Sequence, residues 1–178
     1  GFIGHHVSVK LISLGFSVIG IDNLDNYYDP KLKKNRLKRA KNLSKTFKGN
    51  FKFIKLDLCN KKKINLLFKK FKFKKVIHLA AQAGVRYSLI NPHKYLQSNV
   101  LGFLNILEGC RSSKCTHLIY GSSSSVYGAN TKFPYNEKQH ADHPIQFYAA
   151  TKKSNELMAH SYSHLFKTPT TGLRFFTV

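Results

Sequence analysis

The sequence predicts an α/β protein with a doubly wound parallel sheet. Short strand-like runs alternate strictly with helical patterns along the 178 residues, and this alternation is typical of consecutive βαβ units. The runs are apolar over most of their length, as expected for parallel strands buried in a sheet. Because no repeat, low-complexity linker or boundary interrupts this order, we expect residues 1–178 to form one domain.

Five runs are predicted to be strands, and five stretches around and between them are predicted to be helices. The strands are expected at residues 16–22, 51–57, 75–80, 116–122 and 170–176. The helices are expected at residues 3–14, 31–46, 60–71, 92–112 and 146–167. In a sheet of this kind ligands bind at the carboxyl ends of the strands, so the residues that follow each strand are the first place to look for a site.

The composition suits a globular chain with a core. Of its residues 42% are hydrophobic, and the length matches one domain. No apolar run approaches the roughly 20 residues that span a bilayer. The opening segment GFIGHHVSVK lacks the pattern of a signal peptide. Together these features favour a cytoplasmic protein without a membrane segment.

The cysteines and histidines do not form a metal-binding pattern. Cys59, Cys110 and Cys115 include no CxxC pair, which suits reduced thiols. Cys110 and Cys115 bracket a polar turn after a helix and are expected to pack as small apolar residues. His160 and His164 share a helix face but lack the acidic residue of an HExxH motif, so we expect surface histidines and no metal.

The formal net charge of +22 raises a second functional class, a basic nucleic-acid-binding module. Its strongest support is the lysine-rich segment 31–75. The excess is mostly lysine, it is spread over several predicted helices, and no nucleic-acid-binding motif accompanies it. We therefore expect solvated helix faces, with only salt-sensitive, sequence-independent binding to nucleic acid.

Two features near the start of the chain predict a dinucleotide site. Gly1 and Gly4 lie just before a predicted helix, and bare backbone at a helix N-terminus suits a pyrophosphate. Asp22 ends the first predicted strand, about twenty residues past these glycines. Its carboxylate there can accept hydrogen bonds from an adenosine ribose and repel a 2′-phosphate, which favours NAD over NADP. The alternative for Asp22 is a carboxylate that caps a turn at the end of a strand.

Tyr148 and Lys152 lie four residues apart in the segment YAATKKSNE. Residues at this spacing share a helix face, so a surface contact between ring and cation is one interpretation. The other interpretation is chemical, because an ammonium beside a phenol lowers the phenol pKa from about 10 toward the working pH. A phenolate can take a proton from a sugar hydroxyl, provided that a nicotinamide accepts the hydride from the same carbon.

Seven segments fall in the order and spacing of one family over nearly the whole chain: GFIG, GIDNLDNYYD, HLAAQAGVRYS, SNVLGFLNILEGC, SSSSVYG, YAATKKSNELMAH and TTGLRFF. The chain thus resembles the extended short-chain dehydrogenase/reductases, and among these the NAD-dependent nucleotide-sugar epimerases, closest to those that act on UDP-glucuronate. The resemblance implies a Rossmann-like fold with strand order 3-2-1-4-5-6. It also implies that the first strand and the C-terminal substrate-binding part are missing, so we expect a fragment that is inactive alone, with an unpaired gap beside the missing strand.

The resemblance implies a role for each matching residue. Ser123, Tyr148 and Lys152 match the family's catalytic serine or threonine, tyrosine and lysine, with a one-residue ambiguity between Ser123 and Ser124. The residues that match the NAD site are Gly1, Phe2, Ile3, Gly4, Asp22, Asn23, Asp57, Leu58, Leu79, Ala80, Ala81, Ser98, Tyr148 and Lys152. Arg86, Ser124 and Ser125 are expected to contact the substrate, although a phosphate or surface contact is an equal alternative for Arg86.

The implied reaction is a hydride cycle on a UDP-sugar. Tyr148, helped by Ser123, removes the proton of the 4-hydroxyl while the C4 hydride passes to NAD, and the hydride later returns to the opposite face of a 4-keto sugar. UDP-glucuronate and UDP-galacturonate are the expected pair. A UDP-glucose/UDP-galactose 4-epimerase, or another NAD-dependent sugar epimerase, dehydratase or decarboxylase, is the alternative. Ser125 stands where the dehydratases and decarboxylases carry an acidic residue, which disfavours elimination. A homodimer is one option for the assembly.

Overall fold

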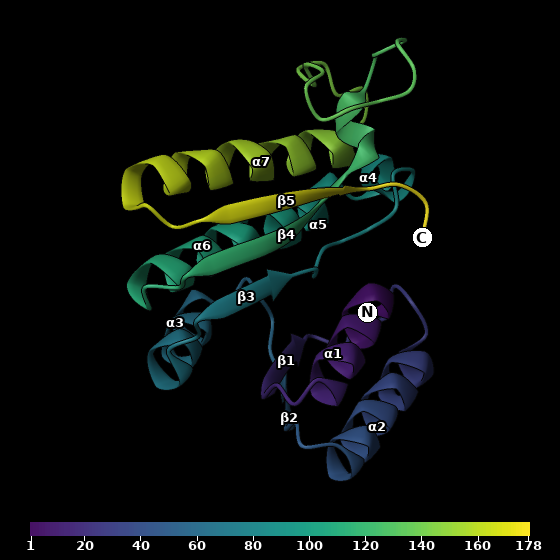
Figure 1. Ribbon diagram of the computed structural model, residues 1–178. Helices are drawn as coiled ribbons and strands as arrows, with labels where there is room; N and C mark the ends of the chain where they lie inside the picture. The colour runs from purple at the N-terminus through teal and green to yellow at the C-terminus, as the bar shows by residue number, and fades with distance from the viewer. The chain divides into compact units, whose positions relative to one another are not determined.

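The computed structural model describes residues 1–178, which divide into two compact units, residues 1–57 and 58–178 (Figure 1). All strand pairs are parallel. The strands form two sheets, with order β1-β2 in the first unit and β3-β4-β5 in the second. The predicted α/β class with parallel strands is therefore confirmed.

The first unit contains two helices and two strands: α1 (Phe2–Ser13), β1 (Val18–Asp22), α2 (Pro30–Thr46) and β2 (Phe51–Lys55). α1 packs against α2 and β1, and α2 also packs against β2. α2 begins where its sequence predicts, because Pro30 occupies the first turn and the Asp29 carboxylate accepts a hydrogen bond from the Lys31 amide at 2.8 Å. The turn before β2 passes close to the end of α1 at Gly49, where an added Cβ would collide with the Ile12 carbonyl oxygen.

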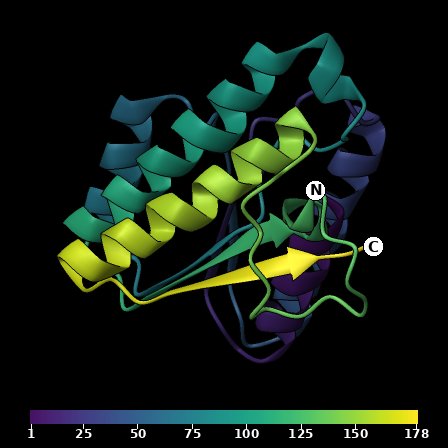
Figure 2. The same ribbon diagram turned by 90° about the horizontal axis from the view of Figure 1, so that it is seen from above.

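The second unit is built around the sheet β3-β4-β5. Its elements in order are α3 (Lys61–Phe71), β3 (Lys75–His78), α4 (Tyr87–Ile90), α5 (Pro92–Tyr95), the π-helical turn η1 (Leu96–Leu101), α6 (Gly102–Ser112), β4 (His117–Ser123), the 3₁₀ helix η2 (Ser124–Tyr127), α7 (Phe147–Phe166) and β5 (Thr170–Phe175). α6 and α7 lie side by side on one face of this sheet (Figures 1 and 2). None of the chain's helices has the combination of length and apolar character that a membrane crossing needs.

The core of the second unit lies between α3, α6 and the sheet. The buried ring of Phe103 packs against the His78 and Tyr120 rings, with 5.2 Å between centroids in both cases. α3 and α6 approach closely at Gly109, where an added Cβ would lie 2.5 Å from the Phe68 ring. Cys110 and Cys115 are buried, as predicted. These contacts hold α6 in place, and α6 in turn positions η1 and α5, which precede it along the chain.

The predicted helix 92–112 is instead three consecutive segments, α5, η1 and α6. Its start is confirmed, because Asn91 accepts a hydrogen bond from the Lys94 amide at 3.2 Å and Pro92 occupies the first turn. The π-helical turn in the middle was not predicted, because one extra residue in a turn leaves the apolar period almost unchanged. The short helix α4 was not predicted either.

The prediction that all five runs are buried strands is confirmed only for β4. β2 has no buried residue, and in β3 only His78 is buried. Every residue of β1 is only half-buried, and three central residues of β5 are exposed. β5 is an edge strand of its sheet, and the helices α6 and α7 of its unit cover one face only (Figure 2). By contrast, β4 is the central strand and is mostly buried.

Candidate functional site

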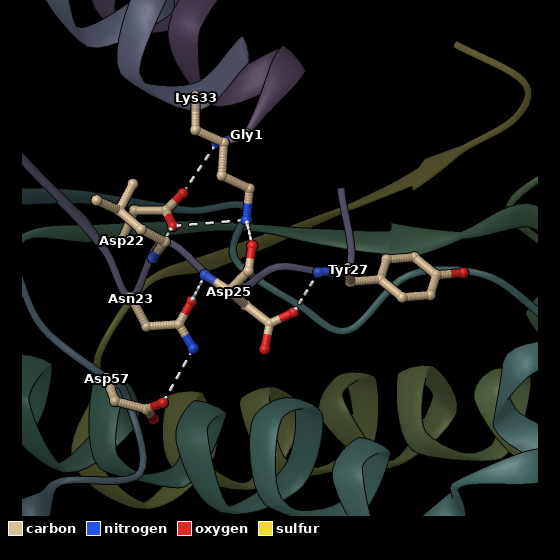
Figure 3. A network of polar contacts seen from close by, with 8 residues as sticks. Gly1, Asp22, Asn23, Asp25, Tyr27, Lys33 and Asp57 are labelled. Carbon is tan, nitrogen blue, oxygen red and sulfur yellow. Dashed lines mark hydrogen bonds and ion pairs between the residues drawn. The ribbon is translucent and has the colours of Figure 1, made fainter. Parts of the chain in front are cut away.

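The predicted site residues form two clusters, and each is described within its own unit. The first lies at the start of α1 and the carboxyl ends of β1 and β2 (Figure 3). The Asp22 carboxylate accepts hydrogen bonds from the Gly1 ammonium at 3.1 Å and from the Leu24 amide at 2.7 Å. The bond from the Leu24 amide is made to Oδ1, and it is the turn cap that was the alternative role for Asp22. The Gly1 ammonium bonds to the other oxygen, Oδ2.

A chain of short polar contacts continues from Asp22 along the loop. The Asn23 side chain accepts from the Asp25 amide at 3.0 Å, and the Asp25 carboxylate accepts from the Tyr27 amide at 2.8 Å. Such side-chain turns fix a loop without regular structure. Asn23 also donates to the Asp57 carboxylate at 3.0 Å, and this bond joins the ends of β1 and β2. The fold thus brings Asp57 together with the neighbouring residues Asp22 and Asn23, although Asp57 lies 34 positions after Asn23 in the chain.

The start of α1 presents bare backbone. An added Cβ at Gly1 or Gly4 would meet no atom within 4 Å, so the space beside both glycines is open. Phe2 is exposed, with the Arg36 guanidinium 5.3 Å from its ring centroid, and Ile3 is half-buried. An anion at this helix start would meet unpaired N–H groups and the positive end of the helix dipole.

The second cluster is centred on Lys152, which is 4% exposed on α7. Its ammonium donates a hydrogen bond to the Gly121 carbonyl oxygen at 2.8 Å, near the end of β4. Burial lowers the pKa of Lys152 to about 8. His78, at the end of β3, is also buried, and burial together with the charge of Lys152 lowers the pKa of His78 to about 3. The imidazole is therefore neutral at physiological pH, and Lys152 carries the local positive charge.

Tyr148 lies one turn before Lys152 on α7 and is half-buried. Its ring meets the Tyr95 ring edge to face, with centroids 6.1 Å apart. Tyr95 is fully buried, and its hydroxyl donates to the carbonyl oxygens of Ala83 and Gly84. The Tyr148 amide donates to the Ser88 hydroxyl at 3.3 Å. The first turn of α7 is thus positioned against the segment that follows β3.

Ser123 ends β4 and is 8% exposed. Its hydroxyl accepts a hydrogen bond from the Ser125 amide at 3.2 Å and lies 3.2 Å from the Ser125 hydroxyl. The preceding serine, Ser122, donates instead to the Glu156 carboxylate at 2.7 Å. Glu156 also pairs with Arg174 of β5, with 2.8 Å between Nε and Oε1. α7 therefore fixes the end of β4 through two side chains, Lys152 and Glu156.

A buried network of amides, which the sequence did not predict, supports this cluster. The Asn99 side chain accepts from the Gln82 amide at 2.8 Å and donates to the Gln82 carbonyl and the Thr151 hydroxyl. The Asn155 side chain donates to the Asn99 carbonyl at 2.7 Å. Asn99 lies in the π-helical turn η1, a distortion often found at functional sites. In the sequence, Asn99 and Asn155 are polar residues within predicted helices, and nothing local distinguishes them from residues that face solvent.

The remaining predicted residues of the second unit are partly accessible. Leu79 is half-buried and Ala80 and Ala81 are exposed after β3, and Ser98 is half-buried in η1. Ser124 and Ser125 are half-buried in η2, and Arg86 is exposed at the start of α4. Leu58 is half-buried, and its carbonyl accepts a hydrogen bond from the Asn105 side chain at 2.7 Å. His160 and His164 are exposed on α7, as predicted.

The parallel sheets, the glycine start of α1 and the Tyr148–Lys152 pair on α7 define an α/β protein of the extended short-chain dehydrogenase/reductase class. Within this class, the chain belongs to the GDP-mannose 4,6 dehydratase family, whose model matches residues 1–178.

Three known proteins illustrate the relationship. UDP-glucuronate 4-epimerase 4 of Arabidopsis thaliana is 48% identical over the whole chain, which covers 40% of that protein. The crystal structure of UDP-glucuronic acid 4-epimerase from Bacillus cereus, in complex with UDP-glucuronic acid and NAD, is 31% identical with a TM-score of 0.87, over 99% of this chain and 54% of that one. UDP-glucose 4-epimerase of Thermotoga maritima, solved with UDP-glucose, is 31% identical with a TM-score of 0.84, over 98% of this chain and 52% of that one. The chain spans about half the length of the curated relatives it matches.

Proposed function

We propose that this chain forms the cofactor-binding and catalytic part of a nucleotide-sugar 4-epimerase that interconverts UDP-glucuronate and UDP-galacturonate. The observation that carries the proposal is the second cluster, in which Tyr148 and Lys152 lie one turn apart on α7 and Lys152 is bonded to the end of β4. A surface pair would leave the lysine in solvent, whereas Lys152 is 4% exposed. The similarity to UDP-glucuronate 4-epimerases supports the same activity.

The residues of both clusters fit NAD as the cofactor. In the first unit, the open backbone at Gly1 and Gly4 suits a pyrophosphate, and the Asp22 carboxylate suits a ribose hydroxyl. Asn23, Asp57 and Leu58 would border the adenosine, while Leu79, Ala80, Ala81 and Ser98 would flank the rest of the dinucleotide. Phe2 and Ile3 would complete the phosphate turn. The bound cofactor would supply reversible hydride transfer at the sugar C4.

The protein's own part in the reaction is to move one proton and to fix the sugar. The Tyr148 hydroxyl is the proposed base for the 4-hydroxyl proton, and the Ser123 hydroxyl would hold the same sugar oxygen. The Lys152 ammonium would favour the ionised phenol by its positive charge, and it would also hold the nicotinamide ribose. Burial of Lys152 strengthens this electrostatic effect, because a charge acts over a longer range where water is excluded.

The choice of a uronate rests chiefly on the similarity to UDP-glucuronate 4-epimerases, and a polar rim beside the second cluster is compatible with it. Ser124 and Ser125 are half-buried hydroxyls, and neither is acidic, so the rim offers donors for a carboxylate and no acidic group for elimination at C5 and C6. Arg86 would add a cation that can face a carboxylate with two hydrogen bonds. The alternative, a UDP-glucose 4-epimerase, is supported by the similarity to the Thermotoga maritima structure.

Product analysis of the full-length gene product tests the proposal. Incubated with UDP-glucuronate, it should form UDP-galacturonate with little release of carbon dioxide. Mainly UDP-pentose would indicate a decarboxylase, and turnover of UDP-glucose alone would indicate a hexose epimerase. The full-length gene product should also be titrated with NAD and NADP, which tests the cofactor choice separately from the sugar.

The basic residues favour solvated faces over a nucleic-acid site. Lys34, Lys38, Lys41 and Lys45 line one exposed face of the single helix α2. A row of lysines on one helix predicts binding that salt weakens and sequence does not affect. Selective retention of one nucleic-acid sequence or structure at physiological salt would revive the alternative function.

A further inference from the structure

The end of the second unit at which β4 and β5 begin carries a feature that the proposed function does not use. α6 and α7 both end there (Figure 2). An open cavity of about 390 Å³ at this end is lined by Arg111, Lys114, Cys115, Thr116, Phe166, Lys167, Thr168 and Pro169. The cavity therefore presents one thiol among three cationic side chains.

The way in which α6 ends brings Cys115 against Cys110. Lys114 adopts a left-handed conformation with φ of 51°, its amide donates to the Arg111 carbonyl at 3.2 Å, and the Cys115 amide donates to the Cys110 carbonyl at 2.9 Å. These two bonds form a Schellman motif, which places the side chains of its first and last residues in contact. Here these two residues are Cys110 and Cys115, and the Cys115 thiol donates to the carbonyl oxygens of Lys74 and His117, at 3.2 Å in both cases.

The two thiols have different surroundings. Cys110 is fully buried, whereas Cys115 is 5% exposed and lines the cavity. The neighbouring Cys115 thiol, followed by burial, raises the pKa of Cys110 above its ordinary value. The neighbouring Cys110 thiol, with help from the backbone at His117 and Val76, lowers the pKa of Cys115 below its ordinary value against the effect of burial. Cys115 is therefore the more acidic of the two thiols and the one that lines the cavity.

The cavity has an excess of positive charge. Arg111 pairs with Glu108, with 2.8 Å between Nη2 and Oε2. Lys114 and Lys167 both follow helix ends in left-handed conformations, and they bring two more cations to the same cavity. An incoming anion would thus be attracted to the wall that contains Cys115.

We propose that Cys115 and Cys110 form a modification site for small anionic disulfides of the glutathione type. The Cys115 thiolate attacks one sulfur of glutathione disulfide, the S–S bond of the disulfide breaks, and one glutathione thiolate leaves and takes a proton from water. Cys110 then loses its proton to water and attacks the Cys115 sulfur, and the second glutathione thiolate leaves. The two cysteines are oxidised by two electrons to one disulfide, and one glutathione disulfide is reduced to two glutathiones.

Peptide mapping after exposure of the folded chain to glutathione disulfide tests the site. We expect a Cys110–Cys115 disulfide, with Cys59 as the internal control that reacts more slowly. Cys110→Ser should accumulate one glutathione on Cys115, because the second step is removed. Cys115→Ser should leave Cys110 unmodified. Preferential modification of Cys59, or full retention of the Cys110 and Cys115 thiols, would overturn the proposal, and the wild-type result decides even if a variant does not fold.

The role of the charges is tested with two disulfides. The double variant Lys114→Gln, Lys167→Gln should react with glutathione disulfide roughly tenfold more slowly at low ionic strength. It should react with uncharged hydroxyethyl disulfide at a rate within about twofold of the wild type. Lys138→Gln, which removes an exposed lysine outside the cavity, is the matched control. Equal slowing with both disulfides would show that the lysines do not attract the anion, and would overturn that part of the proposal.

Discussion

The two candidate clusters differ in how the chain holds them. In the first unit, Asp22, Asn23 and Asp25 each bond to the amide two residues ahead, and all are exposed or half-buried. In the second unit, Lys152, Asn99 and Asn155 are at most 4% exposed and bond to partners between 17 and 56 positions away. The first cluster is thus held by local turns and the second by tertiary packing. Substitutions in the first cluster should therefore affect cofactor binding, and substitutions in the second should affect catalysis and stability.

The largest expected effect is on catalysis in the second cluster. Tyr148→Phe keeps the ring that packs against Tyr95 but removes the ionisable oxygen. In the full-length gene product, epimerase turnover should fall by about 10² to 10⁴-fold, the usual contribution of general acid–base catalysis, while NAD stays bound. Lys152→Met is the companion variant and should reduce both turnover and NAD retention. If Tyr148→Phe kept nearly normal turnover, Tyr148 and Lys152 would have only a packing role.

Removal of one buried amide should cost stability. Asn99→Ala removes the side chain that bonds to the Gln82 amide and carbonyl, and each unsatisfied buried group costs about 1 to 3 kcal/mol. The Thr151 hydroxyl keeps its bond to the Tyr148 carbonyl oxygen at 2.7 Å. We therefore expect the free energy of unfolding, measured in urea, to fall by about 2 to 3 kcal/mol. The matched change in the first cluster, Asn23→Ala, is exposed and should stay within about 0.5 kcal/mol. Equal losses in both variants would contradict the difference between the clusters.

Asp22 should affect cofactor choice more than stability. A charge-assisted hydrogen bond is worth about 1.5 to 3 kcal/mol, so Asp22→Ala should lower the preference for NAD over NADP by about tenfold or more. Dissociation constants measured with both nucleotides provide the test. Asp22→Asn serves as the control, because it keeps an acceptor for the Leu24 amide while removing the charge that repels a 2′-phosphate. If wild-type protein binds NADP as tightly as NAD, the proposed role of Asp22 is wrong.

The smallest expected effect is on the acid stability of the second unit. Burial raises the pKa of Glu156, but hydrogen bonds from Arg174 and Ser122 outweigh burial and leave the pKa below its ordinary value of 4.5. A lowered pKa means that the folded state is stabilised above pH 4.5, and that this contribution disappears as the pH falls through the lower folded-state value. Unfolding curves of Glu156→Gln should therefore depend less on pH below 4.5 than those of the wild type. Glu137→Gln, at an exposed position, should match the wild type.

The sequence predicted those parts of the molecule that local chemistry determines. The five strands and the start of α2 follow from apolar runs, Pro30 and Asp29, and the turn role of Asp22 was one of two stated alternatives. The motif YAATK predicted the Tyr148–Lys152 pair on one helix. The sequence could not reveal that Lys152 bonds to the Gly121 carbonyl, since only the fold brings these two residues together.

Some features that the sequence did not predict depend on contacts between distant residues, and others have no local signal in the sequence. Asn99 reads as an ordinary polar helix residue until its partners Gln82 and Thr151 are known. The Schellman motif after α6 was hidden because Lys114 occupies the left-handed position that glycine usually takes. The exposure of β5 was missed because an apolar run does not distinguish an edge strand from a central one.

The π-helical turn η1 makes the chain from α5 to α6 sensitive to length rather than to residue type. Each residue of a helix advances the direction of the side chains by about 100°. Deletion of a single residue within Leu96–Leu101 would rotate one flank against the other by about that angle. Phe103 and Leu107 are buried in α6 and would hold that helix in place. The rotation would therefore occur in α5, and it would turn the Tyr95 side chain away from the loop whose Ala83 carbonyl oxygen it binds. A conventional helix of the same composition would therefore present the wrong side chains to α7.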